Sequence, residues 1–363
     1  MKSLRKTVLM TGALLLTGPS ALLQSQQPQP GAGRAPAVQD PQSATDQNGG
    51  QTRIRIPVNQ VIVPVTVKDG AGGLVADLRQ DEFRIFEDNV EQRIAFFRAE
   101  AIPISMVVLI DNDLKSKEAK QVNESLRAIV AALSLNDEAF VCRFDQFFHP
   151  GKGFTSDQDK LLTELKRTRL DDEPSVGPTS PAINNGPTIN GRSATGDAPN
   201  ISGGLANLKG QPTKALDDAV YAAAQLLKDR DRERRKIIFL ISDGVNAPKL
   251  NTYNYDTALK ELLRYNIAVY GVGVGSAFFD RRFERLSKYA HDTGGDVYYG
   301  LKSRAMEELY ARVTEEARNQ YTLAYAPAGT DRGAEYHSIE VRVKREGLTI
   351  LTREGYYAGA TPR

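Results

Sequence analysis

The chain has 363 residues, of which 40% are hydrophobic, so it is long enough to bury one large core or two ordinary ones. Its 47 lysines and arginines nearly balance its 45 aspartates and glutamates, which leaves a net charge of +2. A charge this close to neutral argues against a global field for nucleic acid or for an acidic membrane surface. The densest charge run, residues 228–236, mixes both signs and is typical of a solvated helix end.

The amino-terminal 23 residues have the pattern of an export signal. Three basic residues within the first six precede an apolar stretch over residues 7–16, and small residues and a proline follow it. This stretch is shorter than the roughly 20 apolar residues that a membrane span needs, and no later segment approaches that length. We therefore predict a signal peptide over residues 1–23, export to the periplasm or beyond the cell, and no transmembrane segment.

A linker and a β-rich segment follow the signal. Residues 24–51 are rich in Gln, Pro, Gly, Ala and Ser and contain hardly any large apolar residue, which predicts a disordered linker. From residue 52 onward, short β-branched and aromatic runs alternate with turn residues. These runs predict that residues 52–100 are β-rich, with strands at 54–56, 61–67, 83–88 and 92–97.

From residue 103 onward the pattern alternates between strand and helix. Runs typical of strands lie at 104–110, 139–148, 236–242, 267–274 and 297–299, and the second is expected to turn back at 150–153. Helical patterns lie between and after these runs, at 117–133, 157–168, 213–228, 255–265, 280–290 and 305–317. This alternation predicts a doubly wound, mostly parallel α/β sheet over residues 101–318.

Two further segments complete the predicted organisation. Residues 171–211 are dense in Gly, Pro, Asn, Ser and Thr and lack a hydrophobic period, which favours a disordered insertion. Residues 319–358 return to β-type runs, at 321–325, 337–343 and 348–351. Neither this segment nor the first β-rich segment is long enough to bury a core alone. We therefore predict that the two join in one β-sandwich-like module, into which the α/β domain is inserted.

Asp111-Asn112-Asp113 directly follows the apolar run at 104–110. Two carboxylates at the carboxyl end of a strand lie where open α/β sheets bind ligands. Carboxylate oxygens suit a hard cation, and an aspartate in such a place can also be a phosphoryl-accepting nucleophile. Lys115 follows two residues later and brings a positive charge to the same place.

The ordered set of motifs resembles the von Willebrand factor type A family, in particular a bacterial exported branch with β segments on both sides. The resemblance extends over roughly residues 54–358 and rests on the stretches 104–113, 212–220, 237–244, 267–275, 286–300 and 355–357. It implies the α/β fold of that family and a non-catalytic protein with an adhesion or assembly role. The resemblance also implies that a protein ligand binds at the loops on the carboxyl edge of the sheet.

Many members of this family carry a metal-ion-dependent adhesion site, and the resemblance maps its positions onto Asp111, Asp113, Lys115, Thr213 and Asp243. Asp111, Thr213 and Asp243 match the residue types of the family. Asp113 replaces a serine with another oxygen ligand, whereas Lys115 replaces a serine with a cation. In a metal-bound site of this kind, an acidic residue of the ligand completes the coordination of the ion.

Two interpretations of this degenerate site stay open. In the first, Lys115 turns to solvent, Ser116 supplies a hydroxyl, and the other four side chains hold Mg²⁺, Ca²⁺ or Mn²⁺. In the second, the Lys115 ammonium pairs with the carboxylates in place of the ion, because an ammonium repels a divalent cation in a partly desolvated cleft. The sequence favours the second interpretation, in which a carboxylate of the ligand could pair with the ammonium.

An enzyme is the alternative prediction. An Asp-x-Asp motif after an apolar strand also begins Mg²⁺-dependent phosphatases of the haloacid dehalogenase type, in which Asp111 would be the nucleophile and Asp113 a general acid. The chain departs from that pattern at Leu114-Lys115, and Asp296 stands alone where a paired acidic motif is needed. Binding without catalysis is therefore the preferred prediction.

Overall fold

The structure is a computed structural model that describes residues 60–167, 188–189, 192–193, 214–275, 285–300, 303–327 and 335–358. The predicted signal peptide, the linker and the strand at 54–56 lie outside the described residues, as does Thr213. Of the predicted insertion, only the two-residue strands β8 (Thr188–Ile189) and β9 (Arg192–Ser193) are described. Among the described helices, none is long and apolar enough to cross a membrane.

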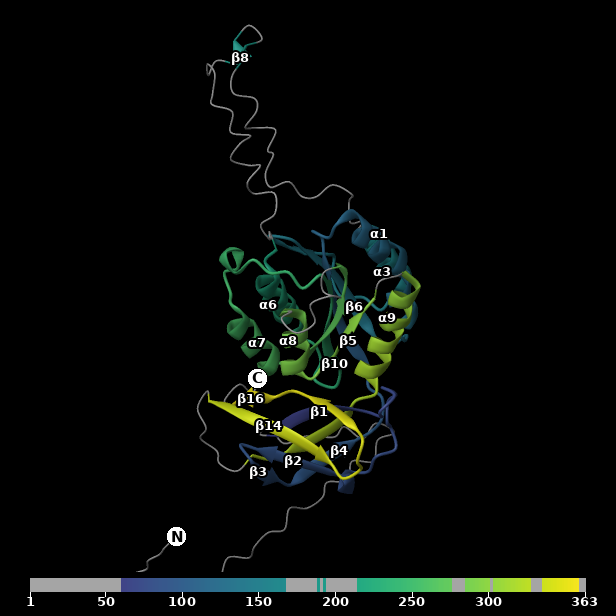
Figure 1. The fold of residues 1–363 in the computed structure, drawn as a ribbon, viewed down its shortest axis with the longest axis vertical. Helices are drawn as coiled ribbons and strands as arrows, with labels where there is room; N and C mark the ends of the chain where they lie inside the picture. Colours follow the sequence, from purple (N-terminus) through teal and green to yellow (C-terminus); the bar gives the residue numbers. More distant parts are fainter. Residues whose placement is uncertain are drawn as a thin grey trace, which may run out of the picture. The chain divides into compact units, whose positions relative to one another are not determined.

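A six-stranded sheet forms the centre of the α/β part, with the order β12-β11-β10-β5-β6-β7 (Figure 1). Its strands are β5 (Ile104–Asp111), β6 (Glu138–Phe144), β7 (Phe148–Pro150), β10 (Arg235–Ser242), β11 (Ile267–Gly273) and β12 (Val297–Tyr299). Five of these strands pair in parallel, and β7 runs antiparallel to β6 at one edge. The predicted doubly wound, mostly parallel sheet is therefore confirmed.

Helices cover both faces of this sheet. One face carries α1 (Ser116–Ser125), α2 (Arg127–Ala132), α3 (Gln158–Arg167) and α9 (Ser303–Arg318). The other carries α6 (Leu216–Leu227), α7 (Tyr255–Arg264) and α8 (Arg285–Thr293). In β5, Met106 and Val108 pack toward the first group of helices, whereas Val107 and Leu109 pack toward the second. A strand that is buried on both faces needs apolar residues throughout, which explains the continuous run in the sequence.

Two elements differ from their prediction. The helix predicted over 117–133 is divided at Leu126, where the Ser125 hydroxyl donates to the Val122 carbonyl and contacts the Tyr310 hydroxyl of α9. A serine that bonds back to its own helix favours a bend there. The strand predicted over 139–148 ends at Phe144 and turns back at residues 145–147, earlier than the predicted turn at 150–153.

The strands before and after the α/β part form two four-stranded antiparallel sheets, with the orders β15-β1-β13-β4 and β16-β14-β2-β3. They are β1 (Val61–Lys68), β2 (Phe83–Glu87), β3 (Val90–Gln92), β4 (Ile94–Arg98), β13 (Tyr321–Tyr325), β14 (Tyr336–Val343), β15 (Thr349–Thr352) and β16 (Gly355–Tyr357). The short 3₁₀ helices are η1 (Gln80–Glu82) and η2 (Pro248–Leu250). Side chains of both sheets, among them Val63, Ile85, Leu323 and Val341, share one core. This confirms the predicted composite β module with the α/β part inserted into it.

The β module contacts the amino edge of the parallel sheet. Arg235, the first residue of β10, donates to the Gln320 carbonyl at 2.6 Å and to the Thr322 hydroxyl at 2.8 Å. Arg353, which follows β15, donates to the carbonyl of Leu263 at the end of α7. Because parallel strands share one direction, the opposite, carboxyl edge lies where β5 ends at Asp111.

The Gly294-Gly295 pair allows a close approach between α8 and the β module. Gly294 has a φ of +77°, and a Cβ there would lie 2.5 Å from the backbone nitrogen of Arg353. A Cβ on Gly295 would lie 2.0 Å from the Val269 carbonyl oxygen. Side chains at either position would separate these backbones, so glycine is required at both.

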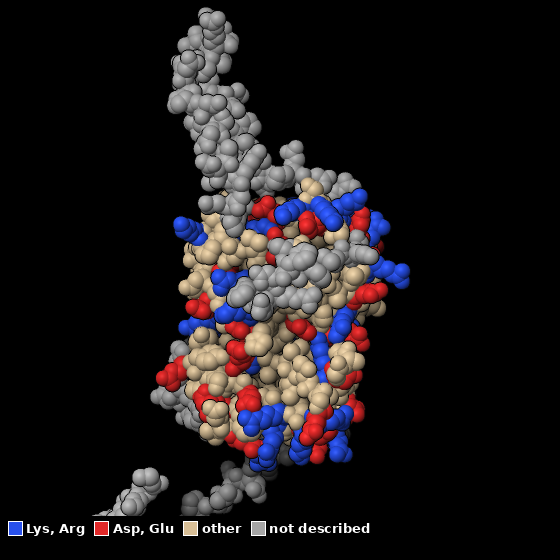
Figure 2. All heavy atoms as spheres, viewed as in Figure 1, with Lys and Arg blue, Asp and Glu red and all other residues tan. Residues whose placement is uncertain are grey.

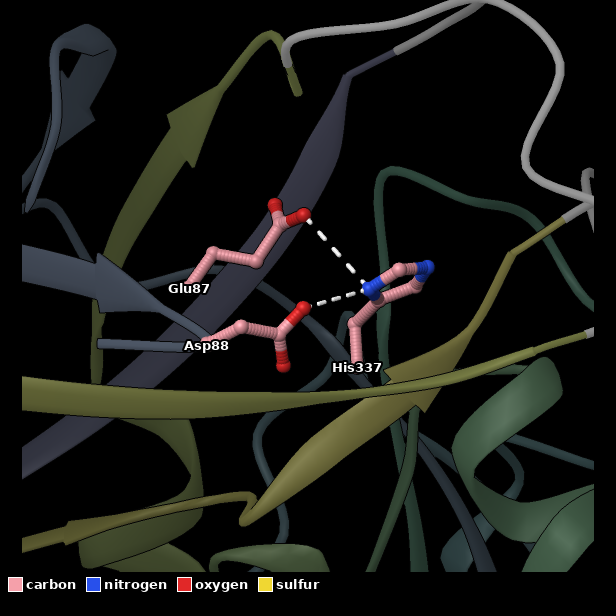
Figure 3. Close-up of side chains that lie close together, drawn as sticks. All are labelled: Glu87, Asp88 and His337. Atoms are coloured by element: carbon pink, nitrogen blue, oxygen red, sulfur yellow. Dashed lines mark hydrogen bonds and ion pairs between the residues drawn. The ribbon is translucent and has the colours of Figure 1, made fainter. Parts of the chain in front are cut away.

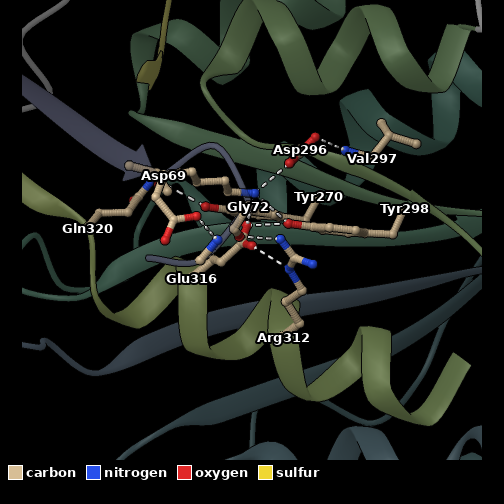
Figure 4. A network of polar contacts seen from close by, with 12 residues as sticks. Asp69, Gly72, Tyr270, Asp296, Val297, Tyr298, Arg312, Glu316 and Gln320 are labelled. Atoms are coloured by element: carbon tan, nitrogen blue, oxygen red, sulfur yellow. Dashed lines mark hydrogen bonds and ion pairs between the residues drawn. The ribbon is translucent and has the colours of Figure 1, made fainter. Parts of the chain in front are cut away.

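A buried ionic network also joins the two parts (Figure 4). The Nζ atom of Lys68, at the end of β1, lies 2.6 Å from Asp296, 2.8 Å from Glu316 of α9 and 2.8 Å from the Tyr298 hydroxyl. The side chains of Lys68 and Glu316 are only 6% and 1% exposed. Arg312, one turn earlier in α9, contacts Glu316 at 3.0 Å. Each buried charge therefore has an opposite charge beside it.

Replacing Lys68 with methionine is expected to destabilise the protein by about 3 kcal/mol, because the substitution leaves Glu316 buried without its closest cation. The free energy of unfolding in urea measures the change. Arg345→Met is the control, since Arg345 pairs with Asp77 on the surface, where water and salt weaken such pairs. Equal, small effects of both substitutions would contradict this role of Lys68.

Candidate functional site

Three loops meet at the carboxyl edge of the sheet around the carboxylate of Asp111. Asp111 ends β5, Asp243 directly follows β10, and Lys214 lies two residues before α6. Lys214 Nζ lies 2.9 Å from Asp111 Oδ2 and 2.9 Å from Asp243 Oδ1. The Lys214 side chain is 4% exposed and that of Asp111 is fully buried. A buried ammonium therefore joins the two carboxylates.

The pairing of neighbouring strands brings the acidic residues together. β5 and β10 are parallel, with Ile110 opposite Ile241, so the residues that follow lie side by side. The Ser242 hydroxyl donates to Asp111 Oδ2 at 2.8 Å, and the backbone N–H of Asp113 donates to Oδ1 at 3.0 Å. Both oxygens of the buried carboxylate are thus hydrogen-bonded, as a charge removed from water requires.

Backbone hydrogen bonds fix the segment that carries Lys214. The Lys214 carbonyl accepts from Ala247 N–H at 2.8 Å, and Ala215 N–H donates to the Asp145 carbonyl at 2.8 Å. In the first turn of α6, Asp217 accepts from the Asn246 side chain at 2.8 Å. The loops after β6 and β10 therefore hold the start of α6 so that Lys214 reaches Asp111.

Burial and charge act on the cluster in opposite directions. Burial raises the pKa of Asp111 to about 6, although the Lys214 ammonium favours its ionised form. Burial also disfavours the charged form of Lys214, but the Asp111 and Asp243 carboxylates outweigh this effect and raise the pKa of Lys214 above its ordinary value. The Lys214 ammonium therefore offsets the charge of the two carboxylates that it contacts.

Two of the four candidate metal ligands, Asp111 and Asp243, belong to this cluster, and a third, Asp113, lies beside it. Asp111 and Asp243 share Lys214, and Asp113 is half-buried with its backbone N–H on Asp111. Thr213, the fourth candidate, lies outside the described residues.

The structure places Lys115 away from the ammonium position. Lys115 and Ser116 are both exposed at the start of α1, where Lys115 is the residue before the first helical turn. The ammonium between the carboxylates belongs to Lys214, which sequence reasoning missed. Its signal was a lone lysine two residues before an apolar helix that has Asp217 and Asp218 in its first turn.

The side chains as they lie do not fit a divalent cation. Mg²⁺ takes about six oxygen ligands near 2.1 Å, and Ca²⁺ takes more at slightly greater distances. The place between Asp111 and Asp243 where such an ion would share both carboxylates holds Lys214 Nζ instead. Asp111 Oδ2 already accepts from both Lys214 and Ser242. An ion at this place requires that Lys214 be displaced.

A second group of metal-type side chains lies in the β module (Figure 3). His337 Nδ1 lies 2.7 Å from Asp88 Oδ2 and 3.8 Å from Glu87 Oε1. Asp88 also accepts from the backbone N–H of Ser338 at 2.9 Å. The His337 hydrogen bond, as the largest effect, lowers the pKa of Asp88. These contacts tie the turn between β2 and β3 to β14, which is a structural role.

Comparisons with known proteins bear on the α/β part. The family model described as von Willebrand factor type A domain matches residues 196–312. A search of curated protein sequences finds no match. The fold is similar to that of BatB from Bacteroides thetaiotaomicron, with a TM-score of 0.40, 14% identity, and coverage of 59% of this chain and 98% of that one.

Two further solved structures are similar. A von Willebrand factor type A protein from Catenulispora acidiphila has a TM-score of 0.41 and 10% identity over 83% of this chain and 73% of that one. The manganese-loaded TRAP protein of Plasmodium vivax has a TM-score of 0.36 and 14% identity over 71% of this chain and 96% of that one.

Titration calorimetry with Mg²⁺ and Mn²⁺ tests the role of Lys214. We expect no heat of binding at this site for the wild type, because the ammonium already neutralises part of the two carboxylates. Lys214→Ser is expected to bind the ions, since it adds a hydroxyl and exposes Asp111 and Asp243 to them. Lys115→Ser is the matched control and is expected to behave as the wild type. Binding by the wild type, or by the Lys115 variant alone, would contradict the assignment.

The raised pKa of Asp111 predicts a pH dependence of stability. Folded Asp111 releases its proton near pH 6, whereas an unfolded aspartate does so near 3.9. Its contribution to stability is therefore largest below about pH 4 and declines by about 3 kcal/mol as the pH rises to 6. The free energy of unfolding of the wild type minus that of Asp111→Asn is expected to fall over this window. Urea unfolding at pH 4 to 7 measures it, and a level or rising difference would refute the raised pKa.

Proposed function

Because the chain contains a von Willebrand factor type A domain, matched over residues 196–312, we propose that it is a non-catalytic binding protein. Its ligand is a protein, and the binding surface is formed by the loops at the carboxyl edge of the sheet. The observation that carries this proposal is the cluster in which Lys214 joins Asp111 and Asp243. The cluster lies at the edge where open α/β sheets bind ligands.

The position of the β module supports the carboxyl edge of the sheet as the ligand-binding edge. Lys68, Arg235 and Arg353 connect that module to the amino edge, and the contacts there are largely buried. The amino edge is thus occupied by the chain itself. Among the described residues, no comparable module covers the carboxyl edge, and the exposed start of α1 lies beside it.

We propose that this site works without a metal ion. The expected Mg²⁺, Ca²⁺ or Mn²⁺ would need the place that Lys214 takes. The proposed adhesion site then differs from a metal-bound one because the Lys214 side chain, and not an ion, supplies the positive charge. An acidic ligand residue would then have no ion to coordinate, and to pair with the ammonium it would have to reach Lys214, whose side chain is only 4% exposed.

Export is part of the proposal, because it determines the compartment in which the protein encounters its ligand. The basic and apolar pattern over residues 1–23 supports a periplasmic or secreted protein. Basic and acidic side chains are interspersed over the face shown in Figure 2, which fits the net charge of +2. Such a surface favours a protein partner over nucleic acid.

The geometry of Asp111 argues against the phosphatase alternative. A nucleophilic carboxylate needs an oxygen that can approach a phosphorus atom. Both oxygens of Asp111 accept hydrogen bonds in the buried cluster, and the residue is 0% exposed. A phosphoryl group could reach it only after Lys214 and Ser242 had moved away.

Affinity capture tests the proposed surface. The immobilised chain is exposed to periplasmic and secreted proteins of the organism that encodes it, and captured proteins are identified by mass spectrometry. Asp113→Arg is expected to abolish capture of the specific partner, because it places a long charged side chain at the carboxyl edge. Glu91→Arg makes the same reversal on an exposed strand of the β module and is expected to capture normally. Equal capture by both variants would refute the carboxyl-edge surface.

A further inference from the structure

We infer that the imidazole of His291 and the carboxylates of Asp292 and Glu354 bind one Zn²⁺ ion. His291 and Asp292 belong to the last turn of α8, and Glu354 lies in the short segment between β15 and β16. These three residues, the His291 site, therefore connect the α/β part with the β module. The site is separate from the cluster around Lys214, so the inference goes beyond the proposed function and does not depend on it.

One imidazole nitrogen faces two carboxylates in the His291 site. His291 Nδ1 lies 3.4 Å from Asp292 Oδ1 and 3.2 Å from Glu354 Oε1. All three atoms lie within 4.8 Å of one another. Nδ1 carries at most one proton, so it can donate a well-aligned hydrogen bond to only one of the two carboxylates. A metal ion between the three atoms would bind all of them at once.

The spacing of these atoms suits ligands around zinc. Hydrogen bonds between a charged N–H group and a carboxylate are usually about 2.7–2.9 Å long, and both contacts of His291 Nδ1 are longer than that. Tetrahedral zinc has bonds of about 2.1 Å to imidazole nitrogen and carboxylate oxygen, which places neighbouring ligand atoms about 3.4 Å apart. The ion therefore requires little movement of these side chains.

Hydrogen bonding at its outer oxygen holds the Asp292 carboxylate in place. Asp292 Oδ2 accepts from the Tyr255 hydroxyl at 2.6 Å. Burial and this hydrogen bond raise the pKa of Tyr255 above its ordinary value, so the hydroxyl keeps its proton and remains a donor. Outer hydrogen bonds of this kind orient the ligands of metal sites. They leave Asp292 Oδ1 on the side of His291 Nδ1.

Backbone contacts fix the two segments that carry the ligands. The backbone N–H of Glu354 donates to the Asp292 carbonyl at 3.3 Å, and the Glu354 carbonyl accepts from the backbone N–H of Ile339 at 2.7 Å. Gly294, two residues after Asp292, permits the close approach of the two backbones. Folding thus brings the three ligands together, and binding the ion requires little further ordering of the chain.

Charge and ligand type favour zinc among the divalent ions. The two carboxylates balance a doubly charged ion, and a neutral imidazole is a good ligand for Zn²⁺, whereas Mg²⁺ and Ca²⁺ prefer oxygen ligands alone. The His291 side chain is 72% exposed and that of Glu354 is 49% exposed, so an ion can enter from solvent. Water then completes the coordination, as in zinc sites with three protein ligands.

Lys288 acts against the ion but does not take its place. The Lys288 ammonium lies 3.6 Å from Asp292, and the nearest oxygen is Oδ2, not the oxygen that faces His291. It also lies over the Tyr255 ring, 3.6 Å from the centroid. Its side chain is 55% exposed, and water and salt screen such a charge.

Titration calorimetry with Zn²⁺, on the chain purified without a histidine tag, tests the inference. We expect the wild type to bind one ion, and Mg²⁺ and Ca²⁺ to give no heat at this site. His291→Gln and Glu354→Gln are each expected to weaken Zn²⁺ binding at least about tenfold, because each removes one ligand. Both side chains are largely exposed, so neither substitution disturbs the core.

The other two histidines of the chain provide matched controls. His149 contacts Asp145 at 3.1 Å, and His337 belongs to the group in the β module. His149→Gln and His337→Gln are expected to bind Zn²⁺ as the wild type does. Zn²⁺ should also raise the melting temperature of the wild type and of both controls by about 3 °C or more, because an ion that binds only the folded chain stabilises it. The His291 variant is expected to show no such shift.

Four results would overturn the inference. The first is a wild type that does not bind Zn²⁺, and the second is binding that His291→Gln leaves unchanged. The third is binding lost in His337→Gln instead, which would place the ion in the β module. The fourth is binding weakened by His291→Gln but not by Glu354→Gln, which would indicate a lone surface histidine. The proposed function is tested separately, by capture of the natural partner with Asp113→Arg.

Discussion

The buried ion pair between Lys214 and Asp111 is the interaction on which the carboxyl edge of the sheet depends. A carboxylate with no exposure to water is costly unless charges and hydrogen-bond donors replace its solvent. For Asp111 these are the Lys214 ammonium, the Ser242 hydroxyl and the backbone N–H of Asp113. They come from the segment before α6, the end of β10 and the loop after β5, so satisfying one carboxylate fixes three segments at once. The surface that we assign to ligand binding is therefore preorganised by the same charge that defines it.

A second buried lysine has the matching role at the opposite edge. Lys68 joins the β module to the α/β part through Asp296 and Glu316. There the side chains of Lys68 and Glu316 are buried, and that of Asp296 is 32% exposed. The carboxyl edge has a similar arrangement, in which Lys214 and Asp111 are buried and the Asp243 side chain is 18% exposed. One network thus joins the β module to the α/β part, and the other joins the loops at the carboxyl edge.

Much of the fold followed from the sequence for one physical reason. Strands buried on both faces, such as β5 and β10, need uninterrupted apolar runs, and these runs stand out without any structural information. The two β segments were too short to fold alone, which required that they pair with each other. The points at which side-chain hydrogen bonds interrupt a helix or a strand were harder to predict. The break at Leu126 depends on the Ser125 hydroxyl and on Tyr310 of a distant helix, and the turn after Phe144 depends on the Asp145 side chain.

The sequence by itself determined that acidic residues would gather where β5 and β10 end, because parallel neighbouring strands deliver their last residues to one place. It also favoured, of two open interpretations, the one in which a lysine takes the place of a metal ion there. Only the tertiary structure decided which lysine. Lys115 is near Asp111 in sequence but is exposed at the start of α1, whereas Lys214 is 103 residues away and points into the cluster. The direction of a long side chain depends on how its loop is anchored, and for Lys214 the anchors are the backbones of Ala247 and Asp145. No local pattern records contacts over that distance.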